Sequence, residues 1–430
     1  MKSTFSKWLN KLGPGLITGA ADDDPSGIAA YSQGGAQYGF GTLWTLFFTY
    51  PLMVGIQIIS ARIGCVTGRG LASNLAATNS RGTTLSLITL LLIANTINIG
   101  ADLAAMADAI KLVLGGPRHV YAVALGLVCL LLQVFIPYRR YVRVLKWLTL
   151  SLFAYVGTVF ASHVPWDEVM RGTLVPKTEF SQNYFFLIVA IFGTTISPYL
   201  FFWQSGQEVE ELAVQRDGNS LRKSPKDAQQ HLLRINIDTV IGMAFSNLIA
   251  FFIMLTTAVT LYTHGLHDIQ TSAQAAEALR PIGGEFTFTL FAAGIIGTGM
   301  LAVPVLAGSA AYAVAETFRW SSSLGLELKS AKGFYTIIAL ATLVGVLLDF
   351  SPIDPVKALL WSAVINGVIS VPLMIAMMRI ATQKQIMGEF VIGARLKWLG
   401  WLATAVMTLV VLSFGLISLM EYFNVELHIF

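Results

Sequence analysis

The chain is a succession of long apolar segments separated by short polar ones. A helix needs about twenty mostly apolar residues to cross a bilayer, and eleven segments come close to that length or exceed it. They cover residues 13–38, 41–63, 84–112, 119–137, 144–163, 183–206, 232–262, 286–317, 333–349, 356–379 and 397–420. The pattern therefore predicts an all-α polytopic membrane protein with eleven transmembrane helices.

The composition agrees with this pattern. Hydrophobic residues make up 55% of the 430 residues and charged residues 12%, whereas about a quarter of the residues of a soluble protein are charged. We therefore expect a single transmembrane domain over residues 1–430. The two cysteines, Cys65 and Cys129, lie far apart in apolar segments, which favours buried small side chains over a redox pair or a metal site.

The basic residues are distributed unevenly between the two ends of the predicted helices. If the N-terminus is cytoplasmic and the helices alternate in direction, the inner segments hold 22 of the 28 Lys and Arg residues. Cytoplasmic loops are enriched in these residues, so we expect a bacterial inner membrane protein with its N-terminus inside and its C-terminus outside. The net charge of +4 then reflects orientation and does not indicate nucleic acid. The lipid bilayer is the expected partner; the oligomeric state is left open, and a monomer is compatible with the sequence.

Two of the apolar segments carry strong helix-breaking signals at mid-length. They are "DDDPSG" at Asp22–Gly27 and "FGTTISPYL" at Phe192–Leu200. Proline removes a backbone donor and clashes with the preceding turn, and free backbone groups in a bilayer are tolerated where protein buries them or where they line a cavity. Broken first and sixth helices are typical of transporters built from inverted repeats, which bind their substrate at the breaks. We expect five-plus-five repeats over about 13–163 and 183–379, with an extra helix at about 397–420.

Four motifs resemble those of one transporter family. "GPGLITGAADDDPSG" is similar to the GPG…DPGN start of the NRAMP divalent-metal transporters, "GRGLA" at Gly68–Ala72 to their GRDLA, "IGADLA" at Ile99–Ala104 to ATDLAE, and "GTTISPYLFFWQS" at Gly193–Ser205 to GATIMPHNLYLHS. The resemblance covers nearly the whole chain in topology and is specific in the first three segments and the sixth. It implies a LeuT-like fold.

The resemblance also implies a metal site at the two breaks. The family's aspartate is present as Asp24, and the two carbonyl positions are Ala21 and Thr194. The family's asparagine is replaced by Gly27 and its methionine by Ser197. These five residues are the candidate site.

Further family positions along the transport pathway are altered. The two histidines of the sixth helix are replaced by Tyr199 and Gln204. In the third segment the aspartate is kept as Asp102, but the glutamate three residues later is Ala105. Tyr199, Gln204 and Ala105 cannot replace the family's two histidines and its glutamate, so we expect weak or absent proton coupling.

The substitutions change the metals that the site would prefer. A thioether suits softer transition metals, whereas carboxylate, hydroxyl, carbonyl and water suit Mg²⁺, Ca²⁺ and Mn²⁺. Ser197 removes the soft ligand, and Gly27 leaves room for a partly hydrated ion. The site then resembles that of the NRAMP-related branch that carries Mg²⁺. We expect a transporter of hard divalent cations, Mg²⁺ first and Mn²⁺ tolerated, with no cofactor. The alternative is an NRAMP scaffold that has lost metal binding and carries another small solute.

Three other acidic residues have roles that the sequence leaves open. Asp22 and Asp23 either cap the outer half of the broken helix, whose start favours aspartate, or line the vestibule and concentrate cations. Glu316 is expected to pair with a basic residue at the inner end of its helix. An enzyme is not expected, because the six histidines lie in or near predicted loops and form no HEXXH motif.

Overall fold

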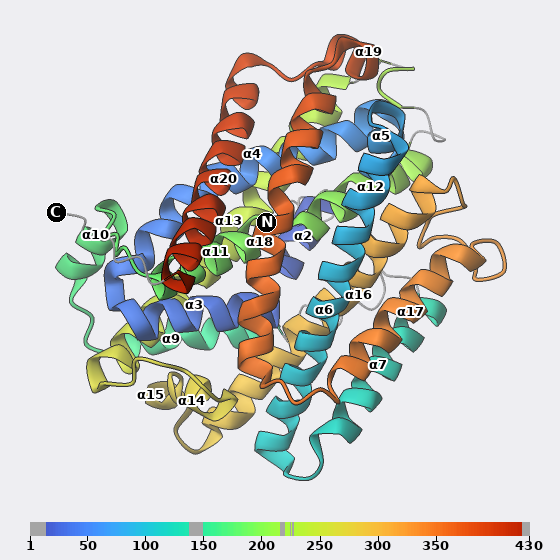
Figure 1. Cartoon of the computed structure of the whole chain (residues 1–430). Helices are drawn as coiled ribbons and strands as arrows, with labels where there is room; N and C mark the ends of the chain where they lie inside the picture. Colours follow the sequence, from blue (N-terminus) through green and yellow to red (C-terminus); the bar gives the residue numbers. More distant parts are fainter. Residues whose placement is uncertain (1–13, 137–148, 216–219, 224, 226–227, 424–430) are drawn as a thin grey trace, which may run out of the picture.

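The computed structural model describes residues 14–136, 149–215, 220–223, 225 and 228–423, and the regular structure in these ranges is helical (Figure 1). Short 3-10 turns join some of the helices. The α-helices are α2 (Pro14–Asp22), α3 (Pro25–Tyr38), α4 (Leu43–Thr67), α5 (Leu71–Thr78), α6 (Arg81–Leu114), α7 (Arg118–Phe135), α9 (Phe153–Ala161), α10 (Trp166–Leu174), α11 (Gln182–Thr195), α12 (Pro198–Gln215), α13 (Ala228–Thr260), α14 (Ser272–Glu277), α15 (Arg280–Gly283), α16 (Thr287–Thr317), α17 (Lys332–Leu348), α18 (Pro355–Thr382), α19 (Lys384–Met387) and α20 (Ala394–Tyr422).

The expected apolar segments coincide with these helices, which confirms the all-α class. The first part of the segment 144–163 lies outside the described residues. Within the described residues, eight helical stretches are long and apolar enough to cross a membrane, and one of them, Pro25–Thr67, contains both α3 and α4. Leu150–Ala161 and Lys332–Leu348 are shorter apolar helices. The total of eleven crossings therefore stays a prediction.

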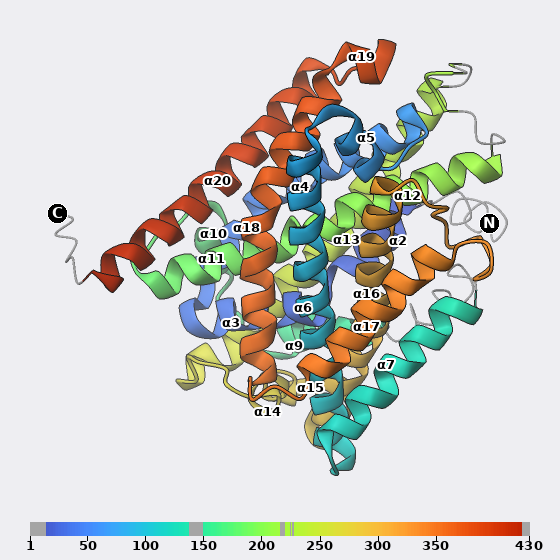
Figure 2. The same cartoon turned by 45° about the vertical axis from the view of Figure 1, so that its right-hand side comes forward.

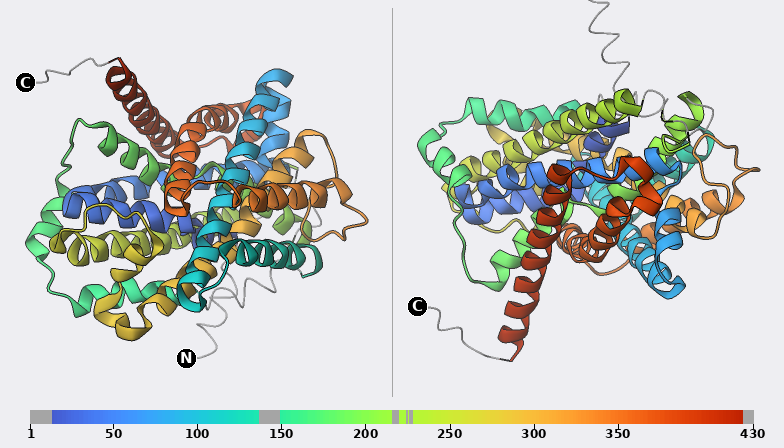
Figure 3. Two further views of the ribbon diagram at one scale, coloured as in Figure 1. Left: turned by 60° about the horizontal axis from the view of Figure 1, so that its bottom comes forward. Right: turned by 90° about the horizontal axis from the view of Figure 1, so that it is seen from above.

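Helix α20 lies at the periphery of the molecule. Figure 3 shows it at the red end of the sequence colours, with its C-terminal end away from the other helices. Its large apolar side chains are exposed in the isolated chain, among them Leu409, Leu412 and Leu416. A soluble protein rarely exposes so large an apolar face, and a bilayer would cover this one.

Two helices are broken, at the two positions that the sequence indicates. The first break lies at Asp23 and Asp24, between α2 and α3, and the second at Ile196 and Ser197, between α11 and α12. In each case the second half starts on a proline, Pro25 or Pro198. Proline suits the first position of a helix, because the N–H that it lacks would have no partner there.

The broken helices lie in the interior of the bundle. Figures 1 and 2 show α6 and α18 crossing in front of α2, α11 and α13. Helix α13 packs along α2 and α3, and α18 packs along α11. The packing is close: a Cβ atom at Gly35 would lie 2.0 Å from the carbonyl oxygen of Met254, and one at Gly193 would lie 2.1 Å from that of Ala363. Glycine is needed at both positions, since a larger residue would push the helices apart.

Within the described ranges, no basic side chain pairs with Glu316, contrary to our expectation. Its carboxylate accepts a hydrogen bond from the backbone N–H of Ser73 at 3.2 Å, at the start of α5. The first N–H groups of a helix have no partner within the helix, and Glu316 supplies one from α16. A Cβ atom at Gly70 would lie 1.7 Å from Oε1 of Glu316, which accounts for the second glycine of the "GRGLA" motif.

Candidate substrate site at the two helix breaks

Asp24 caps the second half of the first broken helix. Its backbone is extended (φ −71°, ψ 168°), and Oδ1 accepts hydrogen bonds from the Gly27 N–H and the Ser26 hydroxyl, both at 2.7 Å. An aspartate before proline at a helix start commonly adopts this geometry. The local sequence therefore fixes the position of this carboxylate at the break, and Asp24 is buried there.

The other carboxylate oxygen of Asp24 is held by two distant helices. Oδ2 accepts a hydrogen bond from Nδ2 of Asn98 in α6 at 2.9 Å, and Ser362 in α18 donates to Oδ1 of the same asparagine at 2.8 Å. The sequence analysis missed Asn98 and Ser362. Asn98 lies four residues before Asp102, so the two share one face of a helix, and that spacing was the available signal.

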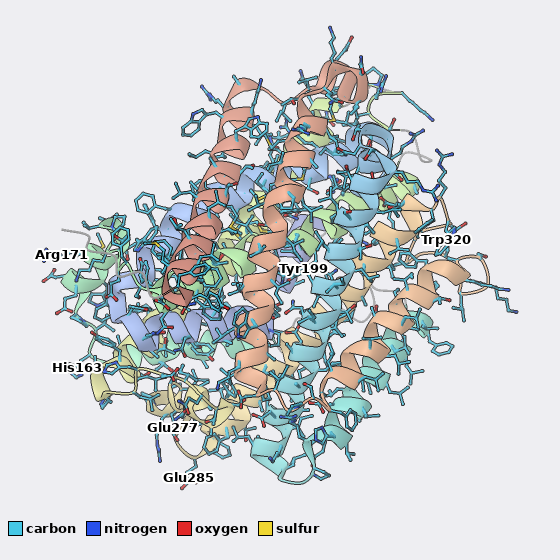
Figure 4. The ribbon with its side chains drawn as sticks, in the orientation of Figure 1. His163, Arg171, Tyr199, Glu277, Glu285 and Trp320 are labelled. Atoms are coloured by element: carbon cyan, nitrogen blue, oxygen red, sulfur yellow. The ribbon has the colours of Figure 1, made fainter. Side chains whose placement is uncertain are left out.

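The second break touches the first through two tyrosines. The Tyr199 hydroxyl donates to the carbonyl oxygen of Ala21 at 3.1 Å, and the Tyr31 hydroxyl is 3.3 Å from Oγ1 of Thr195. Figure 4 shows Tyr199 in the middle of the molecule, whereas the labelled charged residues, such as Arg171 and Glu285, lie at its rim. Tyr199 therefore occupies one of the two carbonyls that we expected to bind the ion.

Ser197 satisfies its hydroxyl within its own broken helix. Oγ donates to the carbonyl oxygens of Gly193 at 2.8 Å and Thr194 at 2.7 Å. These are carbonyl groups of the last turn of α11, which have no partner further along because the helix stops. The Thr194 carbonyl, the second expected ligand, is thus occupied by a hydroxyl in this conformation.

A threonine of the second broken helix lies close to Gly27. A Cβ atom at this position would lie 2.9 Å from Oγ1 of Thr194, which is too close for a carbon atom unless the threonine moves. In this conformation the neighbouring helix brings a threonine hydroxyl beside the smaller residue. The roomier site at Gly27 stays a prediction.

Asp22 and Asp23 share one hydroxyl group. Oγ of Ser246, in α13, lies 2.7 Å from Oδ2 of Asp22 and 3.1 Å from Oδ1 of Asp23. The other oxygen of Asp22 is buried and has no hydrogen-bond partner among the residues that the structure describes. Neither residue caps α3, since Asp24 does so, and both are buried rather than open to a vestibule.

Asp102 and Gln204 differ in how they relate to Asp24. Asp102 is fully buried. It lies close to the backbone N–H of Ser26 and near enough to Asp24 for the two charges to repel each other. Gln204 donates instead to Oγ1 of Thr239 at 2.9 Å. The structure thus brings Asp102 to the first break and directs Gln204 toward α13.

The arrangement offers oxygen atoms and negative charge. Among the described residues, no three side chains of His, Cys, Asp and Glu come together as a cluster that would hold a metal ion. The expected donors are instead one carboxylate, two carbonyls and a hydroxyl, and each already has a hydrogen-bond partner. This set suits a hard cation that keeps part of its water, after these hydrogen bonds rearrange.

Comparison with known proteins identifies the family. The family model described as natural resistance-associated macrophage protein-like, or Nramp, matches residues 15–416. A divalent metal cation transporter MntH of Bradyrhizobium diazoefficiens is 27% identical over 96% of this chain and 91% of its own. One from Mycobacterium tuberculosis is 24% identical over 93% of this chain and 89% of its own.

Solved structures share the fold. The manganese transporter of Eremococcus coleocola, determined with an aromatic bis-isothiourea compound, superimposes with a TM-score of 0.74 at 18% identity, covering 95% of this chain and 87% of that one. A nucleobase-cation-symport-1 family transporter in a closed conformation gives a TM-score of 0.56 at 14% identity, over 97% and 94% of the two chains. The family model, which spans almost the whole sequence, and this likeness together show that the chain is an integral membrane protein with a LeuT-like fold and that it belongs to the Nramp family.

Proposed function

We propose that the chain transports divalent metal cations across a membrane by alternating access, with Mg²⁺ and Mn²⁺ as its cargo. The carrying observation is the buried carboxylate of Asp24 at the break between α2 and α3, where the Tyr199 hydroxyl from beside the second break also binds the Ala21 carbonyl. An ionisable group at membrane depth is costly and marks a functional site by default. The names of the relatives, which transport divalent metal cations or manganese, support the same class of cargo.

The charge around the first break favours a cation. Asp22, Asp23, Asp24 and Asp102 are all buried. In the part of the chain that the structure describes, the ion pairs involve Asp349, Glu208 and Glu277 and none of these four aspartates. Buried carboxylates without a basic partner are stabilised by a bound cation or proton, so a positively charged cargo fits this site better than an anion.

The donor types favour a hard cation. Hydroxyl, carbonyl and carboxylate oxygens suit Mg²⁺ and Mn²⁺, and the position where the family has a thioether is Ser197. Mg²⁺ gives up its water reluctantly, so the proposed ion keeps several waters and contacts few protein atoms directly. The proposed ligand set is Asp24, the carbonyls of Ala21 and Thr194, and Ser197, with Gly27 beside it.

In this conformation, both carbonyl groups of the proposed ligand set already accept hydrogen bonds. Tyr199 occupies the Ala21 carbonyl, and Ser197 occupies that of Thr194. Cargo binding would require the two breaks to separate, which alternating access provides. The same contacts favour a second candidate, a scaffold that has lost metal binding and carries another small solute, because they complete the site without an ion.

We further propose that transport is driven by the ion gradient and the membrane potential, with little or no proton coupling. Tyr199, Gln204 and Ala105 stand where the family has titratable groups. A divalent cation moving into a negative interior gains about 4.6 kcal/mol per 100 mV, twice the value for a single charge. The proposal includes the five-plus-five repeats at about 13–163 and 183–379 and a location in the bacterial inner membrane.

Asp24→Asn tests the site directly. The amide keeps the size of the side chain and an oxygen that can cap α3, but it removes the charge that would hold the ion. We expect saturable Mn²⁺ and Mg²⁺ uptake into reconstituted vesicles by the unmodified chain, without acidification of the lumen, and at least a hundredfold loss of uptake in the variant. Asp167→Asn, an exposed aspartate of α10, is the matched control and should retain full uptake.

The outcomes separate the two candidates. Uptake by Asp24→Asn equal to that of the unmodified chain would refute the assignment of Asp24 as the ligand. If the unmodified chain neither binds nor takes up Mg²⁺ or Mn²⁺, metal transport is refuted and the second candidate is favoured. Metal-dependent acidification of the lumen would contradict the proposed lack of proton coupling.

A further inference from the structure

A hollow with a volume of about 480 Å³ opens at the end of the molecule where α5 and α19 lie, at the top of Figures 1 and 2. Its walls come from four segments that are distant in sequence. They are the end of α4 with the following residues Gly68 and Arg69, helix α5, the turn Ser220–Lys223 after α12, and helix α19. This hollow is a different place from the two helix breaks, which lie in the interior.

Hydrogen bonds fix the walls of the hollow relative to one another. The N–H groups of Leu221 and Arg222 donate to the carbonyl oxygens of Cys65 at 3.3 Å and Val66 at 3.2 Å. The Asn74 amide donates to the backbone carbonyls of Arg69 and Gly70, both at 2.9 Å. The turn after α12 is therefore tied to the end of α4, and α5 is tied to the loop that precedes it.

Packing between the walls also explains a glycine. Gly68 has φ +66°, a conformation that side chains with a Cβ rarely adopt. A Cβ atom there would also lie 2.8 Å from Cβ of Ser220. The close approach of the two segments depends on this glycine, and it sets the depth of the hollow.

Among the described residues, the charged side chains that line the hollow are all basic. They are Arg69, Arg222 and Lys223. Among the described residues, no ion pair involves any of these three side chains. Nη1 of Arg222 donates to the carbonyl oxygens of Gln385 at 2.8 Å and Ile386 at 2.9 Å. Those bonds hold the guanidinium in place and leave its Nε and Nη2 donors for a ligand.

We propose that this hollow binds a phosphate group, carried by an anionic lipid headgroup or by a soluble phosphate compound. Arginine forks match phosphate oxygens, and lysine adds a point charge. The volume exceeds that of inorganic phosphate alone and falls within the range of small-ligand sites. Because the walls come from both halves of the chain, a bound phosphate group would join α4 and α5 to α19 and to the turn after α12.

A solvated basic surface would not have these features. Cytoplasmic loops are enriched in Lys and Arg because of the protein's orientation in the membrane. That enrichment does not require the basic side chains to line one hollow, and it does not require backbone carbonyls to hold them in place. Three cations around one hollow repel each other, and an anion relieves that repulsion. The proposal is independent of the proposed metal transport, because a cluster of cations does not attract a metal ion.

The test measures ligand-dependent thermal stability of the purified full-length chain in nonionic detergent. The probes are dioctanoyl phosphatidylglycerol, dioctanoyl phosphatidylcholine and inorganic phosphate. A ligand that binds only the folded state raises the unfolding temperature. We expect phosphatidylglycerol to raise it and phosphatidylcholine to leave it unchanged. A rise with inorganic phosphate as well would assign the site to phosphate from any source, and no rise with phosphate would assign it to the lipid.

Arg69→Gln with Lys223→Gln is the variant of choice. Neither side chain makes a hydrogen bond in the described structure that holds the walls, so the fold should persist, whereas Arg222 supports α19. We expect the apparent affinity to fall roughly thirtyfold, about fivefold for each basic residue near an anionic surface. Lys329→Gln with Lys332→Gln, exposed residues outside the hollow, removes the same charge and should leave the affinity unchanged. The proposal would be overturned if neither phosphatidylglycerol nor inorganic phosphate raised the unfolding temperature. Equal affinity of the two double variants for phosphatidylglycerol would also overturn it.

Discussion

At the residue scale, Asp24 shows how one carboxylate can be both a structural cap and a ligand. An ionised carboxylate has about four acceptor positions, and Gly27, Ser26 and Asn98 use three of them. About one position remains for an ion. We therefore expect Asp24 to bind its cargo through a single oxygen, with water completing the coordination shell.

Ser197→Met tests whether position 197 faces the ion. The thioether would restore a soft ligand, and it would release the Thr194 carbonyl that the serine hydroxyl now occupies. We expect the ratio of Cd²⁺ or Mn²⁺ affinity to Mg²⁺ affinity to rise about tenfold, because thioethers prefer softer metals. Isothermal titration with each metal measures this ratio.

Ser370→Met is a suitable control for that experiment. Ser370 is buried in α18, and among the described residues its hydroxyl donates to the carbonyl oxygen of Gly367 in the same helix. The same substitution there should leave the ratio unchanged. An unchanged ratio in Ser197→Met, with binding intact, would mean that position 197 does not contact the ion.

The residues around Asp24 also mark the limit of residue-level prediction. Asp24 itself was predictable, because the Asp-Pro-Ser-Gly stretch carries its own capping signal. Asn98 and Ser362 were missed because an asparagine or serine within an apolar helix has no local signature. They became visible as partners only after three helices had been placed beside one another.

At the element scale, α13 supports the first half of the broken helix. Oδ2 of Asp238 accepts a hydrogen bond from the Gly15 N–H at 2.7 Å, at the start of α2. Ser246 binds Asp22 and Asp23 at the other end of the same half. Helix α2 is thus held at both ends by one neighbour. A movement that opens the site from this side would have to break both contacts.

Ser246→Ala tests the contact at the break. The substitution leaves two buried carboxylates without their shared hydroxyl, and a buried acceptor that loses its donor is destabilising. We expect the free energy of unfolding to fall by about 1 kcal/mol, the scale of hydrogen bonds between membrane helices. Thermal unfolding of the purified protein would measure the loss.

The matched control is Ser370→Ala, which removes a buried hydroxyl whose bond, in the described part of the chain, is to a carbonyl of its own helix. The free energy of unfolding should fall less in this variant than in Ser246→Ala, because the substitution leaves no buried carboxylate without a donor. Equal losses in the two serine variants would mean that Ser246 contributes packing alone and does not hold the first half of the broken helix.

At the scale of the whole molecule, the two ends of the bundle carry the segments that the alternation of helices assigns to them. Helices α5 and α19, which the alternation places inside, lie at one end of Figures 1 and 2, and α14 and α15, which it places outside, lie at the other. The described geometry therefore agrees with the alternation. Which end faces the cytoplasm stays a prediction that rests on the uneven distribution of Lys and Arg.

Single introduced cysteines test the orientation. We expect Gln270→Cys, near α14, to react with a membrane-impermeant maleimide on intact cells. We expect Ser321→Cys, shortly after the end of α16, to react only after the cells are opened. Both positions are exposed. The unmodified chain is the control, because Cys65 and Cys129 are buried. The reverse pattern of labelling would mean that the protein has the opposite orientation.

The sequence by itself determined the helical class, the two helix breaks and the position of Asp24. These features depend on hydrophobic segment length, on proline and on capping, which act within a few residues of the chain. Only the tertiary structure decided which groups meet: Ser246 with Asp22 and Asp23, and a threonine hydroxyl with Gly27. The physical reason is that such contacts depend on the packing of helices that are distant in sequence, and no local pattern encodes their relative positions.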